Sequence, residues 1–259
     1  GPVVTAMSYC AAYYSTVAVI GGPATVYQYG VAYMMPNLLG ATFTTGILIF
    51  VLMALKMRVV SERSQAVSLP SFLNVRFESR SVGAIAGVII AVMMIPYSVS
   101  VLKGIADGFN VLAGVPYEVA VVVLSLVSIL YLMFSGYWGI AQTDMIQGIL
   151  IALGMVALCI YVVVSCGGVT ELIQGATAAD PARMADPPAY YGNMWNCLSV
   201  CWVWQIIAFG QPQLVTKFMG LKDSRTMKTV IRVSVPWIAI FLTCSGLIAL
   251  GGLYMFGPD

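Results

Sequence analysis

The sequence predicts an all-α integral membrane protein with about seven transmembrane helices. Of its 259 residues, 60% are hydrophobic and only 8% are charged, whereas a soluble domain usually carries about 25% charged residues. So few charges cannot cover a surface that faces water, but a surface that faces lipid needs no polar cover. The apolar residues also form stretches close to the length of about 20 residues that crosses a bilayer.

Seven stretches are apolar and long enough to be spans. They are Val3–Tyr27, Val31–Met57, Val82–Leu102, Val119–Trp138, Met145–Cys166, Met194–Val215 and Val230–Phe256. The polar segment Arg58–Ser81 is expected to hold an interfacial helix that begins near Ser68–Pro70, and Gly167–Asn193 is expected to be a surface loop. Because apolar stretches lie almost at both ends, we expect further helices beyond each end of the chain.

The basic residues predict the orientation. Ten of the twelve flank the loops after the second and sixth spans, which lie on one side of the bilayer if the span count is right. They are Lys56, Arg58, Arg63, Arg76, Arg80, Lys217, Lys222, Arg225, Lys228 and Arg232. Since the more basic side of a membrane protein is cytoplasmic, we expect a multi-pass protein of the inner (plasma) membrane. The first span then runs outward and the sixth runs inward.

Several classes of function are excluded by what the chain lacks. It has no histidine, no CxxC pair and no GxxxxGK[ST] loop, so neither a catalytic triad, a zinc or haem site, nor an ATP-binding loop is expected. The net charge of +2, without a basic cluster, gives no reason to expect nucleic acid as a partner. We expect no enzyme activity and no cofactor.

The first and sixth spans are interrupted by helix-breaking residues. The first contains Gly21, Gly22 and Pro23, and the sixth contains Gly210 and Pro212. Glycine and proline at membrane depth free backbone groups that a bound ion or solute can satisfy, although either span alone is equally well explained as a kinked helix. Two interrupted spans, five apart and opposite in direction, are typical of the inverted repeat of a secondary transporter. The pair therefore favours transport, with these five residues as the unwound positions.

The polar and aromatic residues of the spans supply the candidate ligands. Asp144, at the inner end of the fifth span, is either a helix cap that faces the cytoplasm or an intramembrane carboxylate that binds Na⁺. The candidate solute contacts are Tyr13, Tyr14, Tyr97, Trp204 and Gln205, for which aromatic packing is the competing explanation. A channel is a weaker hypothesis, because no filter-like or pore-lining repeat is present.

Four stretches of the chain, in order, resemble the sodium:solute symporter family. They are Gly1–Gly30, Leu69–Phe77 (like LPxFLxxRF), Ser135–Gln147 (like GGxxAVxxTDxxQ) and Phe209–Ser224 (like FGQPxxxxRFMxxKDS). The resemblance implies a LeuT-type inverted-repeat bundle within one transporter domain, residues 1–259. Residues 1–166 would form the first repeat of five helices, and residues 194–256 would form the first two helices of an incomplete second repeat.

The same resemblance implies Na⁺ as the coupling ion. It places first-helix Na⁺ ligands at Ala12 and Ser15, with partners on an eighth core helix that the chain lacks, and it implicates Asp144 in a second Na⁺ position. The family imports small polar organic solutes, and pantothenate is the first candidate here. Proline-type members carry other residues where this chain has Tyr13 and Ala208, which argues against proline as the first candidate. The second candidate solute is therefore proline or another amino acid, or a carboxylate. A membrane sensor module built on this fold is a further alternative.

Overall fold

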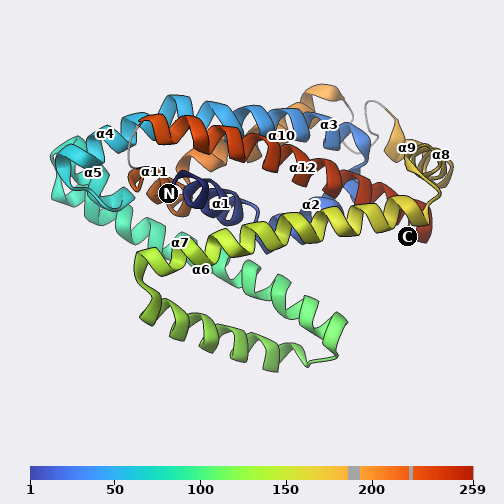
Figure 1. The fold of residues 1–259 in the computed structure, drawn as a ribbon, viewed down its shortest axis with the longest axis horizontal. Helices are drawn as coiled ribbons and strands as arrows, with labels where there is room; N and C mark the ends of the chain where they lie inside the picture. The colour runs from blue at the N-terminus through green and yellow to red at the C-terminus, as the bar shows by residue number, and fades with distance from the viewer. Residues whose placement is uncertain (186–192, 222–223, 259) are drawn as a thin grey trace.

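The computed structural model describes residues 1–185, 193–221 and 224–258, and these residues form helices and connecting turns without a β-strand. Five helices are long and apolar enough to cross a membrane (Figure 1). They are Pro36–Ser64, Arg80–Ala113, Tyr117–Phe134, Gly139–Ser165 and Thr226–Phe256. The chain is therefore a multi-pass membrane protein, as predicted.

The first predicted span is two helices rather than one. α1 (Pro2–Tyr13) and α2 (Thr16–Tyr29) meet at an angle of 52°. The bent pair counts as a sixth span if both halves lie in the membrane. The second span begins as α3 (Val31–Phe43) and passes through two π-helical turns, Thr44–Leu48 and Phe50–Ala54. It ends as α4 (Leu55–Ser64), on the basic side of the molecule.

The short helix expected after the second span is α5 (Leu69–Phe77). Its start is determined locally, because Ser68 and Ser71 form a capping box in which each side chain bonds the other residue's backbone N–H. α6 (Arg80–Ala113) follows directly and packs on α5 at Gly83, where an added Cβ would lie 2.8 Å from the Cβ of Asn74.

The fourth and fifth predicted spans are joined by a tight reversal rather than by a loop. α7 (Tyr117–Ser165) contains one non-helical residue, Gly136, with φ 59° and ψ −178°. The chain doubles back there, so the two halves of α7 form a hairpin (Figure 1). Glycine adopts this φ without the steric penalty that a Cβ brings. Asp144 consequently lies inside the helix Gly139–Ser165, and its interpretation as an N-terminal cap is wrong.

The segment predicted as a surface loop, Gly167–Asn193, contains two helices. They are α8 (Val169–Ala179) and the short α9 (Pro181–Met184), and residues 186–192 lie outside the described part of the chain. α8 forms because Leu172 and Ala176, one helical turn apart, are buried against α12. The Ala-rich composition was therefore a helix signal that the Asp and Pro residues obscured.

The sixth predicted span, Met194–Val215, is also interrupted. α10 (Met194–Ile207) is a shorter apolar helix, and it passes through a 3₁₀ turn, Ala208–Gly210, and an extended Gln211 into α11 (Pro212–Met219). The interruption was predicted, but the helical part before it is shorter than the helices that are long enough to cross a membrane. The last helix, α12 (Ser224–Phe256), is a full span.

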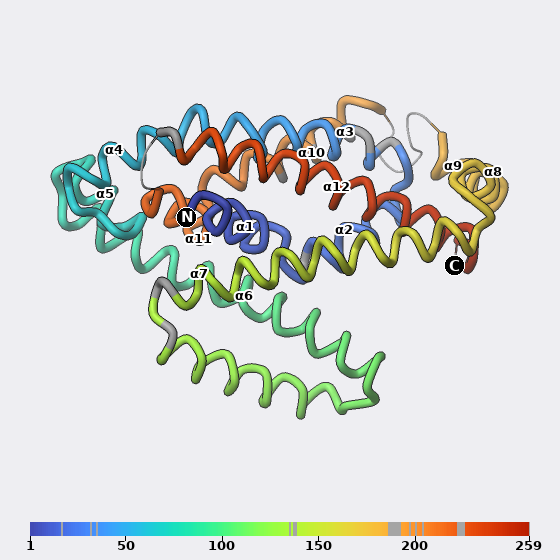
Figure 2. The backbone as a smooth tube through the Cα atoms, viewed as in Figure 1, coloured from blue at the N-terminus to red at the C-terminus, as the bar shows by residue number. Residues whose placement is uncertain are grey.

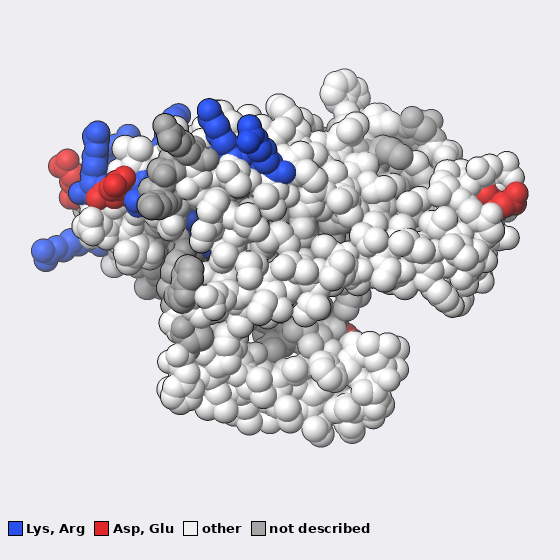
Figure 3. All heavy atoms as spheres, viewed as in Figure 1, with Lys and Arg blue, Asp and Glu red and all other residues white. Residues whose placement is uncertain are grey.

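The helix α1 lies at the centre of the fold. It packs against α7, α12 and α11 (Figure 2). Its Tyr9 is fully buried, and its ring lies 4.8 Å from that of Phe50 and 5.7 Å from that of Phe218. By contrast, α6 and the first half of α7 are mostly exposed. Lys and Arg side chains gather at the end of the molecule that holds α4, α5 and the start of α12 (Figure 3).

Candidate functional site

The first element of the site is the break in the first span at Tyr14 and Ser15. The last bond of α1 runs from the Tyr14 N–H to the Cys10 carbonyl (2.8 Å). α2 begins anew, with the Ala18 and Val19 N–H groups donating to the Ser15 carbonyl. Ser15 itself is extended, with ψ −172°. A helix that ends leaves its last carbonyl groups without helical partners, so the break presents backbone oxygens within the bundle.

The predicted Na⁺ ligands Ala12 and Ser15 both belong to this break. Ala12 lies in the last turn of α1, and Ser15 is the residue before α2. The Ser15 hydroxyl oxygen lies 3.4 Å from the hydroxyl oxygen of Tyr97 on α6. The structure therefore brings a predicted ion ligand and a predicted solute contact together, although 82 residues separate them in the chain.

The residues predicted to unwind the first span do not do so. Gly21, Gly22 and Pro23 lie inside the helix α2, so this prediction is wrong. Gly22 has a packing role instead, because an added Cβ would lie 3.1 Å from the hydroxyl oxygen of Ser245 on α12. The real break falls at Tyr14–Ser15, where no glycine or proline is present.

The second interruption does lie at the predicted residues. Gly210 ends the 3₁₀ turn after α10, and Pro212 is the first residue of α11. Proline suits the first turn of a helix because its missing N–H would have no helical partner there. α11 then packs against α1, so the segments that adjoin the two breaks are in contact.

Asp144 lies in a partly buried network that joins three helices. Its Oδ2 atom accepts a hydrogen bond from the Ser8 hydroxyl on α1 (2.7 Å) and pairs with the Lys217 ammonium on α11 (2.5 Å). Ser8 is one helical turn before Ala12 on α1, whereas Ser15 lies beyond the end of that helix. Among the described residues, Asp144 contacts Ser8 and Lys217 whereas Ser15 contacts Tyr97, so the predicted Na⁺ ligands fall into two groups.

The tyrosines at the break belong to an aromatic cluster. Tyr14 is buried, and its ring centroid lies 4.7 Å from Phe241, 5.3 Å from Trp237 and 4.8 Å from Tyr13. Trp237 donates its ring N–H to the carbonyl of Gly148 on α7 (3.1 Å). Tyr14 is thus held by packing, while Tyr13 is only partly buried beside it.

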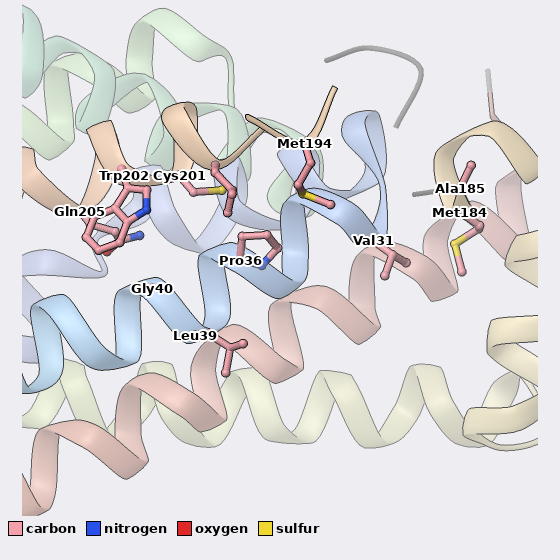
Figure 4. Close-up of a pocket in the computed structure, with 11 residues that line it drawn as sticks. Val31, Pro36, Leu39, Gly40, Met184, Ala185, Met194, Cys201, Trp202 and Gln205 are labelled. Carbon is pink, nitrogen blue, oxygen red and sulfur yellow. The ribbon is translucent and has the colours of Figure 1, made fainter. Parts of the chain in front are cut away.

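Gln205 lies apart from the tyrosines, between α10 and α3. Its amide donates to the side-chain oxygen of Asn37 (2.9 Å), and its oxygen accepts from the Thr44 hydroxyl (3.3 Å). It also lines a groove of about 420 Å³ whose other walls are almost wholly apolar (Figure 4). Because Asn37 and Thr44 bond its side chain, the Gln205 amide is satisfied by the protein itself.

Trp204 is in α10, but its side chain is outside the described part of the structure.

The sequence interpretation did not foresee that Lys217 is buried and paired. Lys217 was grouped with the cytoplasmic basic residues, yet only 8% of it is exposed. The spacing of the apolar residues could have indicated this burial. Leu214 lies three residues before Lys217 and Phe218 directly follows it, and both are buried on the same side of α11. A cation on the apolar face of an amphipathic helix needs a buried partner.

Comparison with known proteins supports the resemblance noted in the sequence. Residues 1–258 match the family described as "Sodium:solute symporter family". The Escherichia coli (strain K12) sodium/pantothenate symporter is 28% identical over 93% of this chain and 50% of its own length. The Staphylococcus aureus sodium/proline symporter is 27% identical over 98% of this chain and 49% of its own length. No solved structure matches.

The chain spans about half the length of these relatives. The family consists of sodium-coupled symporters, which are transporters and not enzymes. The two named relatives carry different solutes at nearly the same identity, so the comparison does not select one solute.

Proposed function

Since this chain belongs to the sodium:solute symporter family, we propose that it forms the ion-binding part of a Na⁺-coupled importer of a small polar organic solute. The observation that carries the proposal is the break at Tyr14–Ser15 in an otherwise apolar first span. Oxygen atoms are the ligands that hard cations prefer. The Ala12 carbonyl and the Ser15 hydroxyl would supply two of them, and further ligands would come from outside this chain.

The solute would bind beside the ion, on the side of Tyr97 and Tyr13. Tyr97 is within 3.4 Å of Ser15, so a solute that hydrogen-bonds Tyr97 would lie next to the Na⁺ ligands. This proximity gives a direct route for coupling, because the ion would orient the groups that the solute contacts. Pantothenate is our first candidate, and proline, another amino acid or a carboxylate is second, in line with the solutes named for the two relatives.

The transport cycle would use the inverted-repeat organisation. The two broken segments, α1–α2 and α10–α11, are the corresponding spans of the two repeats, 1–166 and 194–256, in a LeuT-type bundle. Alternating access would come from rocking of one helix group against the other around the ion. Each Na⁺ that moves inward through a potential of 100 mV would contribute about 2.3 kcal/mol before its concentration gradient is counted.

The orientation follows from the charge distribution. Basic side chains gather at one end of the molecule (Figure 3), and we propose that this end faces the cytoplasm of an inner-membrane protein. Na⁺ and the solute would then enter from the end that holds the α2–α3 turn, α8 and α9.

The test is solute uptake by the full-length protein reconstituted into liposomes. An inward Na⁺ gradient should drive accumulation of labelled pantothenate, and replacement of Na⁺ with K⁺ or choline should abolish it. Proline and simple carboxylates should be assayed in parallel as the second candidates. Uptake that is the same with and without a Na⁺ gradient would show that the coupling proposal is wrong.

A further inference from the structure

Asp144 is paired with a cation that belongs to the protein. Its Oδ2 atom lies 2.5 Å from the Lys217 Nζ, and the side chains are 17% and 10% exposed. The same oxygen accepts the Ser8 hydroxyl bond at 2.7 Å, and Ser8 is 1% exposed. A carboxylate in such surroundings is costly without a positive partner. Here Lys217 supplies that charge.

The neighbours of Lys217 on α11 are buried in the core of the bundle. On α11, Leu214 is fully buried and Phe218 is 1% exposed, with the Phe218 ring 5.4 Å from that of Phe50. On the other side, α1 and α7 approach closely, because an added Cβ on Gly148 would lie 3.0 Å from the Met7 carbonyl oxygen. These contacts bring Ser8, Asp144 and Lys217 together.

The Lys217 ammonium and the Ser8 hydroxyl already occupy the Oδ2 atom of Asp144. Besides Lys217, α11 is contacted by Arg58, whose guanidinium donates to the Met219 carbonyl (3.4 Å) and lies 3.7 Å from Glu62. A Na⁺ bound at Asp144 would have to share Oδ2 with the ammonium or displace it. At the α1–α2 break, by contrast, the Ser15 hydroxyl contacts the neutral Tyr97 hydroxyl, so an incoming Na⁺ meets no competing ammonium in that contact.

We propose that Lys217 is a built-in cation that occupies the ion position of Asp144, so that Na⁺ binds at the α1–α2 break and not at Asp144. This inference rests on the proposed function and refines it, because it assigns the coupling ion to one of the two groups of predicted ligands. The chain would thus supply its own positive charge at Asp144, where the resemblance implied a second Na⁺ position. Removal of that charge should convert Asp144 into a Na⁺ site.

The test counts Na⁺ bound per transporter on the purified full-length protein with radioactive Na⁺. Lys217→Met removes the ammonium at similar side-chain length and should bind one Na⁺ more than the wild type. Lys217→Arg keeps the charge and should match the wild type. The double variant Lys217→Met/Asp144→Asn has neither charge and should also return to the wild-type number.

Two results would overturn the inference. One is a Lys217→Met protein that folds and binds no more Na⁺ than the wild type. The other is a double variant that binds fewer Na⁺ than the wild type, because Asp144 would then have been a native ligand. The double variant leaves no unpaired buried charge, so it decides the matter even if Lys217→Met does not fold. Failure of the proposed function looks different, since the wild type would then show no saturable Na⁺ binding.

Discussion

Replacing Ser15 with alanine tests the Na⁺ site at the α1–α2 break most directly. The change removes one proposed oxygen ligand and leaves the Ala12 carbonyl in place. A hydrogen-bond-like contact contributes about 0.5–1.5 kcal/mol net, and 1.4 kcal/mol corresponds to a tenfold change in affinity. We therefore expect the Na⁺ concentration for half-maximal solute uptake to rise roughly two- to tenfold.

The lost contact with Tyr97 does not account for a change of that size. The two hydroxyl oxygens are 3.4 Å apart, at the long end of the range for a hydrogen bond. Tyr97→Phe removes the same contact but keeps the Ser15 oxygen, so it is the matched control. It should leave the Na⁺ dependence within about twofold of the wild type and should weaken solute binding instead.

The assay is initial-rate uptake in liposomes at graded Na⁺ concentration, with each variant quantified in the membrane. The reasoning is refuted if Ser15→Ala leaves the half-maximal Na⁺ concentration unchanged. It is also refuted if Tyr97→Phe shifts that concentration as much as Ser15→Ala does, because the effect would then arise from the hydroxyl pair and not from ion ligation.

Two further substitutions test the packing around the site. Gly30→Ala should lower the melting temperature of the detergent-solubilised protein, because φ at Gly30 is +84° and an added Cβ would lie 1.7 Å from the Arg183 carbonyl oxygen. Gly154→Ala is the control, because its added Cβ would meet nothing within 4 Å. Equal melting temperatures for the two variants would contradict the close approach at Gly30. Gln205→Leu should lower the free energy of unfolding by about 1–3 kcal/mol, because the Asn37 side chain loses its buried partner. If the variant instead loses solute affinity and keeps its stability, Gln205 belongs to the solute site.

Local sequence signals were sufficient for several elements of the fold. Ser68 and Ser71 define the start of α5 through bonds that reach only three residues. Gly210 and Pro212 mark the second break, because a proline cannot continue a helix ladder and suits a new first turn. The same reasoning failed for Pro23, which α2 accommodates in its interior. Proline composition therefore indicated one break correctly and the other wrongly.

The candidate site was predicted only in part, because its contacts join distant segments. Ser15 was predicted from the resemblance, but its proximity to Tyr97 depends on how α2 packs on α6. Asp144 was a candidate from its position, but neither Ser8 nor Lys217 was recognised as its partner. The Lys217 pairing spans 73 residues, and no spacing rule within one helix reports such a contact.

The sequence by itself determined that this protein crosses a membrane several times, and it predicted which end is basic. These properties depend on apolar length and on where charges are excluded, and both are readable along the chain. Only the tertiary structure decided where the first span breaks and what neutralises Asp144. The physical reason is that a buried charge or a freed carbonyl group is satisfied by whatever the packing brings near it. In this chain α1 packs against both α11 and α7, and this arrangement brings the Lys217 ammonium to Asp144.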